Sequence, residues 1–296
     1  MSFRPLLGEK LGDIKKGRTV EADLAILRLP LYGSFKLDGW RGGWETLEFM
    51  TRHRKTIPNR NLQAMFSRID LPTGWDGEII VGDPYGDGVF KRTDKFCKAQ
   101  LATTPLPIRF FVFDNYEAPG GFSKRLETLY DIHPLVVKLD QILLDTVADV
   151  LALEAKALAL GYEGLVLRDP EGRYKQGRST LREQYLLKLK RFIRFQATVT
   201  GFNERMHNAN EAFDNELGYT KRSSHQENKI PMNTLGSLNC INDAGVEFSV
   251  SGFTAAMAKE IWTNQNKYLG KRPWIKSFPI GQDKAPRQPQ FISWPE

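Results

Sequence analysis

The sequence predicts an α+β chain in which sheets with flanking helices are followed by a small β-barrel. Short strand-like runs separated by Gly, Pro and Asp clusters fill residues 31–112. A stretch with leucine and valine at helical spacing covers residues 136–160. Strand-like runs return beyond residue 191, where one long polar segment interrupts them.

The first of these regions predicts a mixed or antiparallel sheet. Each run is short, apolar or aromatic, and bounded by turn residues, which is typical of strands. The four runs are residues 33–37, 44–49, 77–81 and 108–113. Two further runs, 164–168 and 185–189, are short enough to be central strands.

Residues 136–160 predict one amphipathic helix, and Gly161 follows it as a C-terminal stop. The residues near helical spacing are Leu139, Leu143, Val147, Val150, Leu151 and Leu158.

The last third predicts a small β-barrel with one long loop. Its strand-like runs are residues 197–202, 236–241 and 246–250. The polar segment 203–229 has no aliphatic periodicity, so we expect it to be mobile until it binds something.

Length and charge favour a two-domain protein with a polyanionic partner. The chain has 296 residues, with 42 Lys and Arg against 35 Asp and Glu and a formal net charge of +7. Such an excess attracts nucleic acid, although many basic proteins have no such partner.

Cysteine usage and hydropathy predict a cytoplasmic protein without a membrane span. Cys97 and Cys240 are far apart and show no metal-binding or disulfide-framework spacing. The most apolar stretch, residues 135–160, is interrupted by five charged residues.

Three lysines are candidates for phosphate chemistry. Lys36 ends an apolar run and precedes a turn that carries Asp38 and Arg41. A lysine acts as a nucleophile only when its amine is partly neutral, which needs burial or nearby cations. Lys188 and Lys190 alternate along one strand, so both face one side and would attract a phosphate. A solvated turn and a charged edge strand remain the alternatives.

Two acids and an aromatic residue are further candidates for a nucleotide site, which would have to use side chains. Glu78 and Glu163 each stand at the start of a hydrophobic strand, from which a carboxylate can reach a ribose hydroxyl or hydrated Mg²⁺. Either residue could equally be a turn residue. Phe113 ends an aromatic strand and is placed to stack on a base, although core packing would also explain it. The Gly-rich phosphate loop and the dinucleotide fingerprint are absent from the sequence.

The order and spacing of these motifs resemble the covalent nucleotidyltransferases, the family of ATP-dependent DNA ligases, RNA ligases and mRNA-capping guanylyltransferases. Small two-domain phage-type DNA ligases look closest, because of residues 55–58, 163–170 and 235–253. The matching motifs are residues 36–41, 51–52, 76–78, 113–114 and 163–164, with Lys188 and Lys190.

This resemblance implies an ATP-grasp-like nucleotidyltransferase domain of antiparallel sheets with flanking helices at residues 30–191. An OB-fold β-barrel would follow at residues 192–296, and residues 1–29 would pack on the first domain. The basic residues Lys10, Lys15, Lys16 and Arg18 of that segment would either touch the DNA backbone or belong to a plain N-terminal cap.

The resemblance also implies an ATP-dependent DNA ligase that seals 5′-phosphate/3′-hydroxyl nicks in duplex DNA. Lys36 would carry AMP, which then passes to the DNA, while Lys188, Lys190 and Mg²⁺ or Mn²⁺ neutralise charge. The implied nucleotide contacts are Ser34, Lys36, Arg41, Arg52, Glu78, Phe113, Glu163, Lys188 and Lys190, with Glu163 and Glu78 at the metal. The enzyme would work as a monomer in replication or repair, in a bacterial or phage-infected cytoplasm.

Two alternatives stay open. An RNA ligase or a capping guanylyltransferase shares the Lys-x-Asp-Gly core, although residues 235–253 favour a DNA ligase. A non-catalytic OB-fold protein that binds nucleic acid would leave unexplained the co-occurrence of Lys36, Glu78, Glu163, Lys188 and Lys190. Residues 283–291 resemble the last ligase motif without its further arginines, which leaves Lys284 or Arg287 as candidates to orient pyrophosphate.

Overall fold

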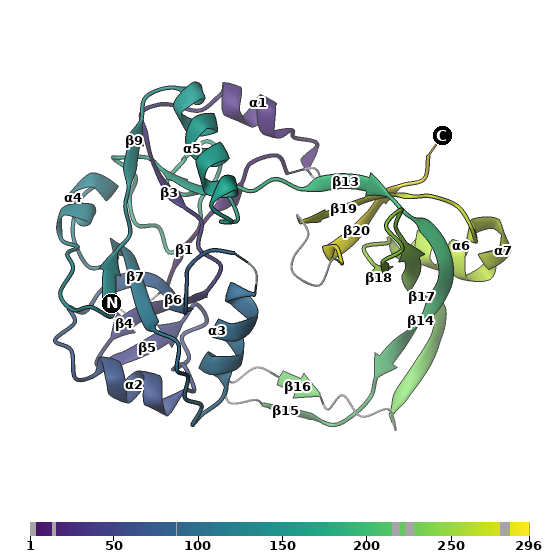
Figure 1. Cartoon of the computed structure of the whole chain (residues 1–296), viewed down its shortest axis with the longest axis horizontal. Coiled ribbons are helices and arrows are strands. Elements are labelled where there is room, and N and C mark those ends of the chain that lie inside the picture. The colour runs from purple at the N-terminus through teal and green to yellow at the C-terminus, as the bar shows by residue number, and fades with distance from the viewer. Residues whose placement is uncertain are drawn as a thin grey trace. The chain divides into compact units, whose positions relative to one another are not determined.

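The computed structural model describes residues 4–13, 16–86, 88–214, 220–222, 228–278 and 285–295, and the side chains of 212–214, 220–222 and 287 are not described. The chain forms two compact units, Met1–Lys190 and Arg191–Glu296 (Figure 1). The first unit contains two five-stranded sheets, and the second contains smaller sheets with two short helices.

The first sheet of unit 1 runs in the order β5-β4-β6-β7-β8 and is antiparallel except at β7 and β8. Its strands are β4 (Trp40–Glu45), β5 (Glu48–Thr51), β6 (Trp75–Val81), β7 (Ile108–Asn115) and β8 (Val136–Lys138). The accompanying helices are α2 (Arg60–Phe66), α3 (Val89–Lys98) and α4 (Phe122–Glu127). Trp44, Phe49 and Phe110 form a buried edge-to-face aromatic core, which fixes this sheet.

The second sheet of unit 1 runs in the order β2-β12-β10-β3-β9. Its strands are β2 (Glu9–Lys10), β3 (Leu31–Phe35), β9 (Ile142–Leu144), β10 (Leu165–Arg168) and β12 (Leu187–Leu189). Helices α1 (Val20–Ala25) and α5 (Val147–Ala159) accompany it, and β1 (Leu6–Leu7) pairs in parallel with β11 (Gly177–Arg178). Leu31, Leu165 and Leu187 are fully buried in its core.

The register of this sheet places functional candidates in one row. Val166 lies opposite Ser34 on one side and opposite Lys188 on the other. Residues directly opposite one another on neighbouring strands point to the same face. Ser34, Val166 and Lys188 therefore share one face of the sheet.

The predicted helix over residues 136–160 is wrong for its first half. Residues 136–138 and 142–144 are the strands β8 and β9, and the helix starts only after Thr146. There, Thr146 and Asp149 form a capping box, which satisfies free backbone N–H groups and sets the start of the helix. Pairing of β9 with β3 outweighed the helical spacing of the earlier leucines.

The predicted strand over residues 44–49 is also wrong, because it spans a hairpin turn. Strand β4 ends at Glu45 and β5 begins at Glu48. Thr46 and Leu47 between them have φ values of 49° and 67°. Both residues adopt the left-handed conformation that a two-residue hairpin turn requires.

Unit 2 is built on one long hairpin between β14 (Thr198–Asn208) and β17 (Lys229–Ile241). The other strands are β13 (Ile193–Gln196), β15 (Ala212–Asp214), β16 (Thr220–Arg222), β18 (Glu247–Val250), β19 (Trp274–Phe278) and β20 (Arg287–Ser293), with helices α6 (Ala255–Thr263) and α7 (Gln265–Tyr268). Leu238, Ile261 and Ile275 are buried in a common core.

The sheets of unit 2 do not close into a barrel within the described residues. Strands β13-β19-β20 and β14-β17-β18 form two three-stranded sheets. A single bridge, Ser251 to Gln290, links them. Much of the polar segment 203–229 is strand rather than loop, because β14 and β17 pair as far as Asn208 and Lys229. No helix in the described part of the chain is long and apolar enough to cross a membrane.

Candidate active site

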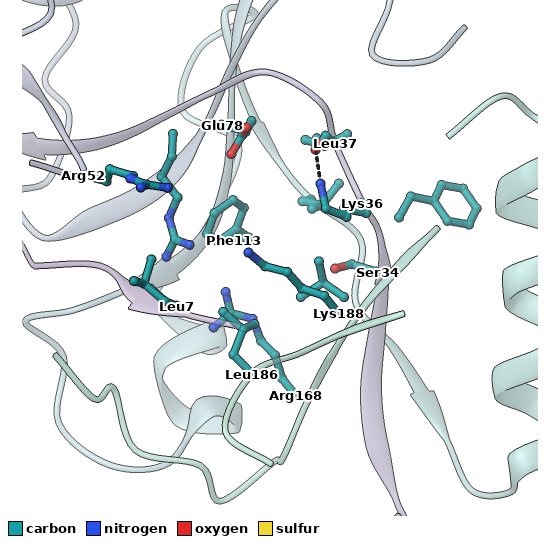
Figure 2. Close-up of a pocket in the computed structure, with 14 residues that line it drawn as sticks. Leu7, Ser34, Lys36, Leu37, Arg52, Glu78, Phe113, Arg168, Leu186 and Lys188 are labelled. Carbon is teal, nitrogen blue, oxygen red and sulfur yellow. Dashed lines mark hydrogen bonds between the residues drawn. The ribbon is translucent and has the colours of Figure 1, made fainter. Parts of the chain in front are cut away.

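A pocket in unit 1 gathers most of the predicted site residues (Figure 2). Seven of the predicted residues line this pocket. The first and last of the seven in the chain, Ser34 and Lys188, are 154 residues apart. The lining residues are Leu7, Ser34, Phe35, Lys36, Leu37, Arg41, Arg52, Glu78, Phe113, Leu139, Val166, Arg168, Leu186 and Lys188. Five of these residues are cationic and one is acidic, so the pocket favours an anion.

Lys36 lies directly beyond β3 and is held by a carboxylate. Its backbone N–H donates to the Gly164 carbonyl at 2.9 Å, which places it beside Glu163. Its ammonium donates to Glu163 and, at 3.3 Å, to the Leu37 carbonyl (Figure 2). Burial lowers the pKa of Lys36, but the Glu163 carboxylate outweighs burial and raises it. The amine is therefore held as an ammonium, where neighbouring cations alone would have made it partly neutral.

Glu163 joins two of the predicted lysines. Its Oε2 accepts from Lys36 and its Oε1 accepts from Lys190. Burial raises the pKa of Glu163, but the two ammonium groups outweigh it and hold the pKa below its usual range. Burial lowers the pKa of Lys190. Glu163 and Lys190 do not line the pocket themselves. Glu163 contacts Lys36, which does line it, and Lys190 contacts Glu163.

Lys188 differs from the other two lysines. Its ammonium points into the pocket toward Phe113 (Figure 2). It has no hydrogen bond or ion pair with any residue in the described part of the chain. Burial, followed by repulsion from Lys36 and Arg41, lowers the pKa of Lys188 to about 8. Lys188 is thus a cation poised for an anionic ligand.

Glu78 stands on β6 across the pocket from these lysines. Its Oε1 accepts a hydrogen bond from the Gly39 N–H at 3.1 Å. Burial raises the pKa of Glu78 to about 7, although Lys36 and Arg41 oppose this. Together, Glu78 and Glu163 are two carboxylates near the pocket. Within the described residues there is no group of three His, Cys, Asp or Glu side chains that would hold a metal ion.

Arg41 is fixed by a buried acid. Its Nε donates to Asp76 Oδ1 at 2.8 Å, and the Tyr174 hydroxyl donates to Asp76 Oδ2 at 2.7 Å. The Phe113 ring lies 5.0 Å from Arg41 Cζ and 5.3 Å from Arg168 Cζ. An aromatic ring bordered by two guanidinium groups can present the remainder of its surface to a base.

Arg52 enters the pocket from the turn after β5. Its Nε donates to His53 Nε2 at 2.8 Å. Next to it, the Thr51 backbone N–H donates to the Lys55 carbonyl at 2.7 Å and Arg54 has a φ of 64°. This tight turn fixes the backbone from which Arg52 extends.

Sequence reasoning missed Arg168 and Leu7. Arg168 lies two residues after Val166 on β10, so strand alternation alone puts both on the pocket face. It is 2% exposed and donates to Asp114 Oδ2 at 2.5 Å. Leu7 had no such signal, since its place depends on the pairing of β1 with β11.

The basic residues of the N-terminal segment have internal partners. Lys16 and Arg18 contact Glu9 at 2.5 and 2.6 Å, and Glu9 is 5% exposed. Arg18 also donates to the Lys10 carbonyl at 3.1 Å. Lys16 and Arg18 therefore compensate a buried carboxylate. Lys15 and Lys284 lie outside the described residues, as does the Arg287 side chain.

The chain is similar in sequence and in fold to DNA ligases. The chain is 26% identical to a Chlorella virus DNA ligase-adenylate over 100% of this chain and 99% of that one, with a TM-score of 0.54. A Lig E DNA ligase shares the fold, with a TM-score of 0.69 and 22% identity over 100% of both chains.

A curated DNA ligase from Haloarcula marismortui is 29% identical over 130 residues, which are 40% of this chain. The match spans about a quarter, 24%, of that relative's length. No family model matches the chain.

Proposed function

We propose that this chain is an ATP-dependent DNA ligase that seals nicks in duplex DNA through an AMP carried by Lys36. Its fold is a nucleotidyltransferase domain followed by an OB-fold domain, the sheets of the latter being open in the described residues. One observation carries the proposal: Lys36, Lys188 and Glu78 meet at one pocket beside Phe113.

Three displacements at phosphorus make up the proposed reaction. The Lys36 ammonium first gives one proton to the Glu163 carboxylate that it contacts. The neutral amine then attacks the α-phosphate of ATP, forms a P–N bond with loss of a second proton to solvent, and expels pyrophosphate. The 5′-phosphate oxygen of the nick then attacks the same phosphorus and releases Lys36. The 3′-hydroxyl finally attacks the activated 5′-phosphate, loses its proton and expels AMP. In-line positioning and charge neutralisation supply most of the acceleration in such transfers.

The pocket's side chains fit these steps. Lys188 offers an unpaired cation to the α-phosphate, and Lys190 adds a second cation through Glu163. Phe113 and Val166 line the pocket and provide apolar contact for the adenine, with Ser34 at its edge. Arg41, Glu78 and Arg52 line the same pocket. In this proposal, Arg41 and Glu78 contact the ribose and Arg52 contacts the 5′-phosphate of the nick.

The carboxylate oxygens of Glu78 and Glu163 are ligands of the kind that Mg²⁺ takes. Mg²⁺ is usually bound through one or two carboxylates together with substrate phosphates and water. Two carboxylates near one cationic pocket match that donor set, and Mn²⁺ takes the same oxygen ligands. When bound, the ion would neutralise phosphate charge.

The wider assignment remains part of the proposal. We assign the nucleotidyltransferase domain to residues 30–191, with residues 1–29 packed on it, and the OB-fold domain to residues 192–296. We further propose that the protein acts on nicked DNA as a monomer in the cytoplasm, in replication or repair. The net charge of +7 supports the DNA partner alone.

Covalent attachment of AMP is the first test. The purified protein incubated with ATP and Mg²⁺ should gain the mass of one AMP on the peptide that contains Lys36, and Lys36→Ala should gain none. Lys98→Ala is the matched control, because Lys98 is an exposed lysine of the same unit that pairs only with Asp94. AMP attached to Lys36→Ala as to the wild type would refute the assignment of the nucleophile.

A sealing assay then identifies the acceptor. Labelled duplex DNA with one 5′-phosphorylated nick should become full-length on a denaturing gel with wild-type protein but not with Lys36→Ala. An RNA nick and a diphosphate-ended RNA are the competing substrates. AMP transfer without sealing of DNA would favour an RNA ligase or a capping enzyme.

A further inference from the structure

The Lys188 ammonium lies in the pocket, but no polar group of the described residues binds it. Glu163 holds Lys36 and Lys190 by ion pairs, whereas the ammonium of Lys188 has no hydrogen bond or ion pair among the described residues. A four-carbon stem without a polar anchor samples several rotamers unless packing restricts it. The position of this ammonium must therefore come from what its stem touches.

The stem of Lys188 lies against the bare Cα of Gly8. A Cβ atom built on Gly8 would lie 2.7 Å from both Cγ and Cε of Lys188 and 3.1 Å from Cδ. Contacts below 3.0 Å between such carbons are strongly repulsive, so the side chain occupies the very space that any other residue at position 8 would fill. The φ of Gly8 lies outside the left-handed region, so its backbone does not itself require glycine.

The backbone on either side of Gly8 is fixed to the sheet. Before Gly8, the Leu7 carbonyl accepts a hydrogen bond from the Ser179 N–H at 2.8 Å. The Gly8 carbonyl itself accepts one from Arg178 Nη1 at 2.7 Å. On the other side, Glu9 N–H donates to the Leu186 carbonyl and Leu11 N–H to the Lys188 carbonyl, both at 3.0 Å. A new side chain at position 8 would therefore move Lys188 rather than the backbone.

We propose that Gly8 is a positioning residue for Lys188: its side-chain-free surface supports the lysine stem and sets where the ammonium lies in the pocket. The N-terminal segment is then a wall of the site, with Leu7 lining the pocket and Gly8 supporting its unpaired cation. The consequence for AMP transfer rests on the proposed function, whereas the position of Lys188 does not.

A size series at position 8 tests the position of Lys188 directly. Acetylation of Lys188 at increasing pH, read by peptide mass spectrometry, reports the fraction of neutral amine. In the wild type the midpoint should lie near pH 8. In Gly8→Val the displaced ammonium is better hydrated, so the midpoint should rise toward the ordinary lysine value of about 10.4, with Gly8→Ala in between. An unchanged midpoint in Gly8→Val would overturn the proposal, whatever the activity.

The matched control is Gly201→Ala in unit 2. A Cβ there would lie 3.5 Å from Asn239 Nδ2, an ordinary contact, so neither Lys188 labelling nor activity should change. The Gly8 variants should also keep a melting temperature within roughly 3 °C of the wild type, because a flexible side chain absorbs the added volume.

A double-mutant cycle tests the effect on catalysis. In a single turnover, AMP attachment to Lys36 should slow several-fold in Gly8→Ala and about tenfold or more in Gly8→Val, since small misplacements of a charged group are costly. In a Lys188→Ala background, Gly8→Val should cause no further loss, because the stem it would displace is gone. Equal losses in both backgrounds would show that Gly8 acts independently of Lys188. Absence of AMP on the wild type would instead refute the proposed function and leave the labelling result to decide the position of Lys188.

Discussion

At the scale of single residues, the site is organised by one carboxylate shared between two lysines. Glu163 side-chain oxygens contact both Lys36 and Lys190, and all three side chains are at most 19% exposed. The sequence identifies each residue but not this arrangement. The shared carboxylate raises the pKa of Lys36, so this proposed nucleophile is held as an ammonium.

Glu163→Gln should release Lys36 from this state. Without the carboxylate, burial and the neighbouring cations would lower the pKa of Lys36, so acetylation of Lys36 at pH 8 should rise several-fold. Loss of the common partner should also reduce the free energy of unfolding by about 2 kcal/mol, less than for a fully buried pair. A drop in Lys36 labelling would contradict this account.

The matched control for that variant is Glu183→Gln, whose partner Lys175 is 37% exposed. It should cost well under about 1 kcal/mol. The pH dependence separates the two variants further. Because the pKa of Glu163 is lowered on folding, its contribution is present above the unfolded-state pKa of about 4.3 and is lost as the pH falls below it. Acid unfolding of Glu163→Gln should lack this loss.

Glu78→Gln should have the opposite effect on stability. Burial raises the pKa of Glu78 from 4.5 to about 7, so the native state binds more protons between these values and stability falls as the pH rises through them. The amide has no charge to bury, so at pH 8 the variant should be more stable than the wild type by about 2 kcal/mol. At pH 4 the difference should vanish. Urea unfolding at pH 8 and at pH 4 measures the two differences in stability. A wild type more stable than the variant at pH 8 would contradict a destabilising buried charge on Glu78.

At the scale of elements, strand pairing places the catalytic candidates and glycines permit the close approach. Gly164 joins Glu163 to β10 and has a φ of 137°. A Cβ built there would lie 2.2 Å from the Leu189 carbonyl oxygen, on the strand that carries Lys188. This approach brings β10 against β12 and hence Glu163 against Lys190.

Gly164→Ala should therefore be strongly destabilising. The backbone oxygen cannot move without breaking the pairing of β10 and β12, so we expect a loss above about 3 kcal/mol in urea unfolding. Gly17→Ala is the control, because Gly17 also has a positive φ, 67°, but nothing lies within 4 Å of its built Cβ. It should lose only about 1 kcal/mol. If the two variants lost the same free energy of unfolding, the effect of Gly164→Ala would come from backbone conformation alone and not from the contact with Leu189.

Sequence patterns identified strands better than helices. Short apolar runs bounded by turn residues correctly located β3, β6, β7 and β10, and many of the apolar residues in these strands are buried. The spacing of leucines in residues 136–144 matched a helix by chance, and pairing of β9 with β3 decided otherwise. Long-range pairing of this kind leaves no mark in a local pattern.

At the scale of the whole molecule, the chain has two units with separate cores. Trp44, Phe49 and Leu165 belong to cores of unit 1, and Leu238 and Ile275 belong to the core of unit 2. Every residue that lines the pocket around Lys36 and Lys188 lies in unit 1. Binding of ATP should therefore stabilise one unit directly.

Scanning calorimetry should resolve two unfolding transitions, one for each unit. ATP should raise the midpoint temperature of only one of them. With the metal chelated to prevent reaction, ATP at a hundred times its dissociation constant should add about 2.7 kcal/mol to the unit that binds it. The midpoint of unit 1 should rise by several degrees, and that of unit 2 should not. Adenosine, which lacks phosphates for Lys188, is the comparison ligand. A shift of the unit 2 transition alone would refute a nucleotide site in unit 1.

The sequence by itself determined the chemical groups and the class of fold. Lys36, Glu78, Phe113, Glu163, Lys188 and Lys190 were chosen from local motifs, and local motifs record which side chains a short segment offers. Only the tertiary structure decided which of them meet. The pairing of Lys36 with Glu163 joins residues 127 apart, and the support of Lys188 by Gly8 joins residues still more distant. Such contacts depend on the register of β2, β12, β10 and β3 in one sheet, which non-local hydrogen bonds and packing set together.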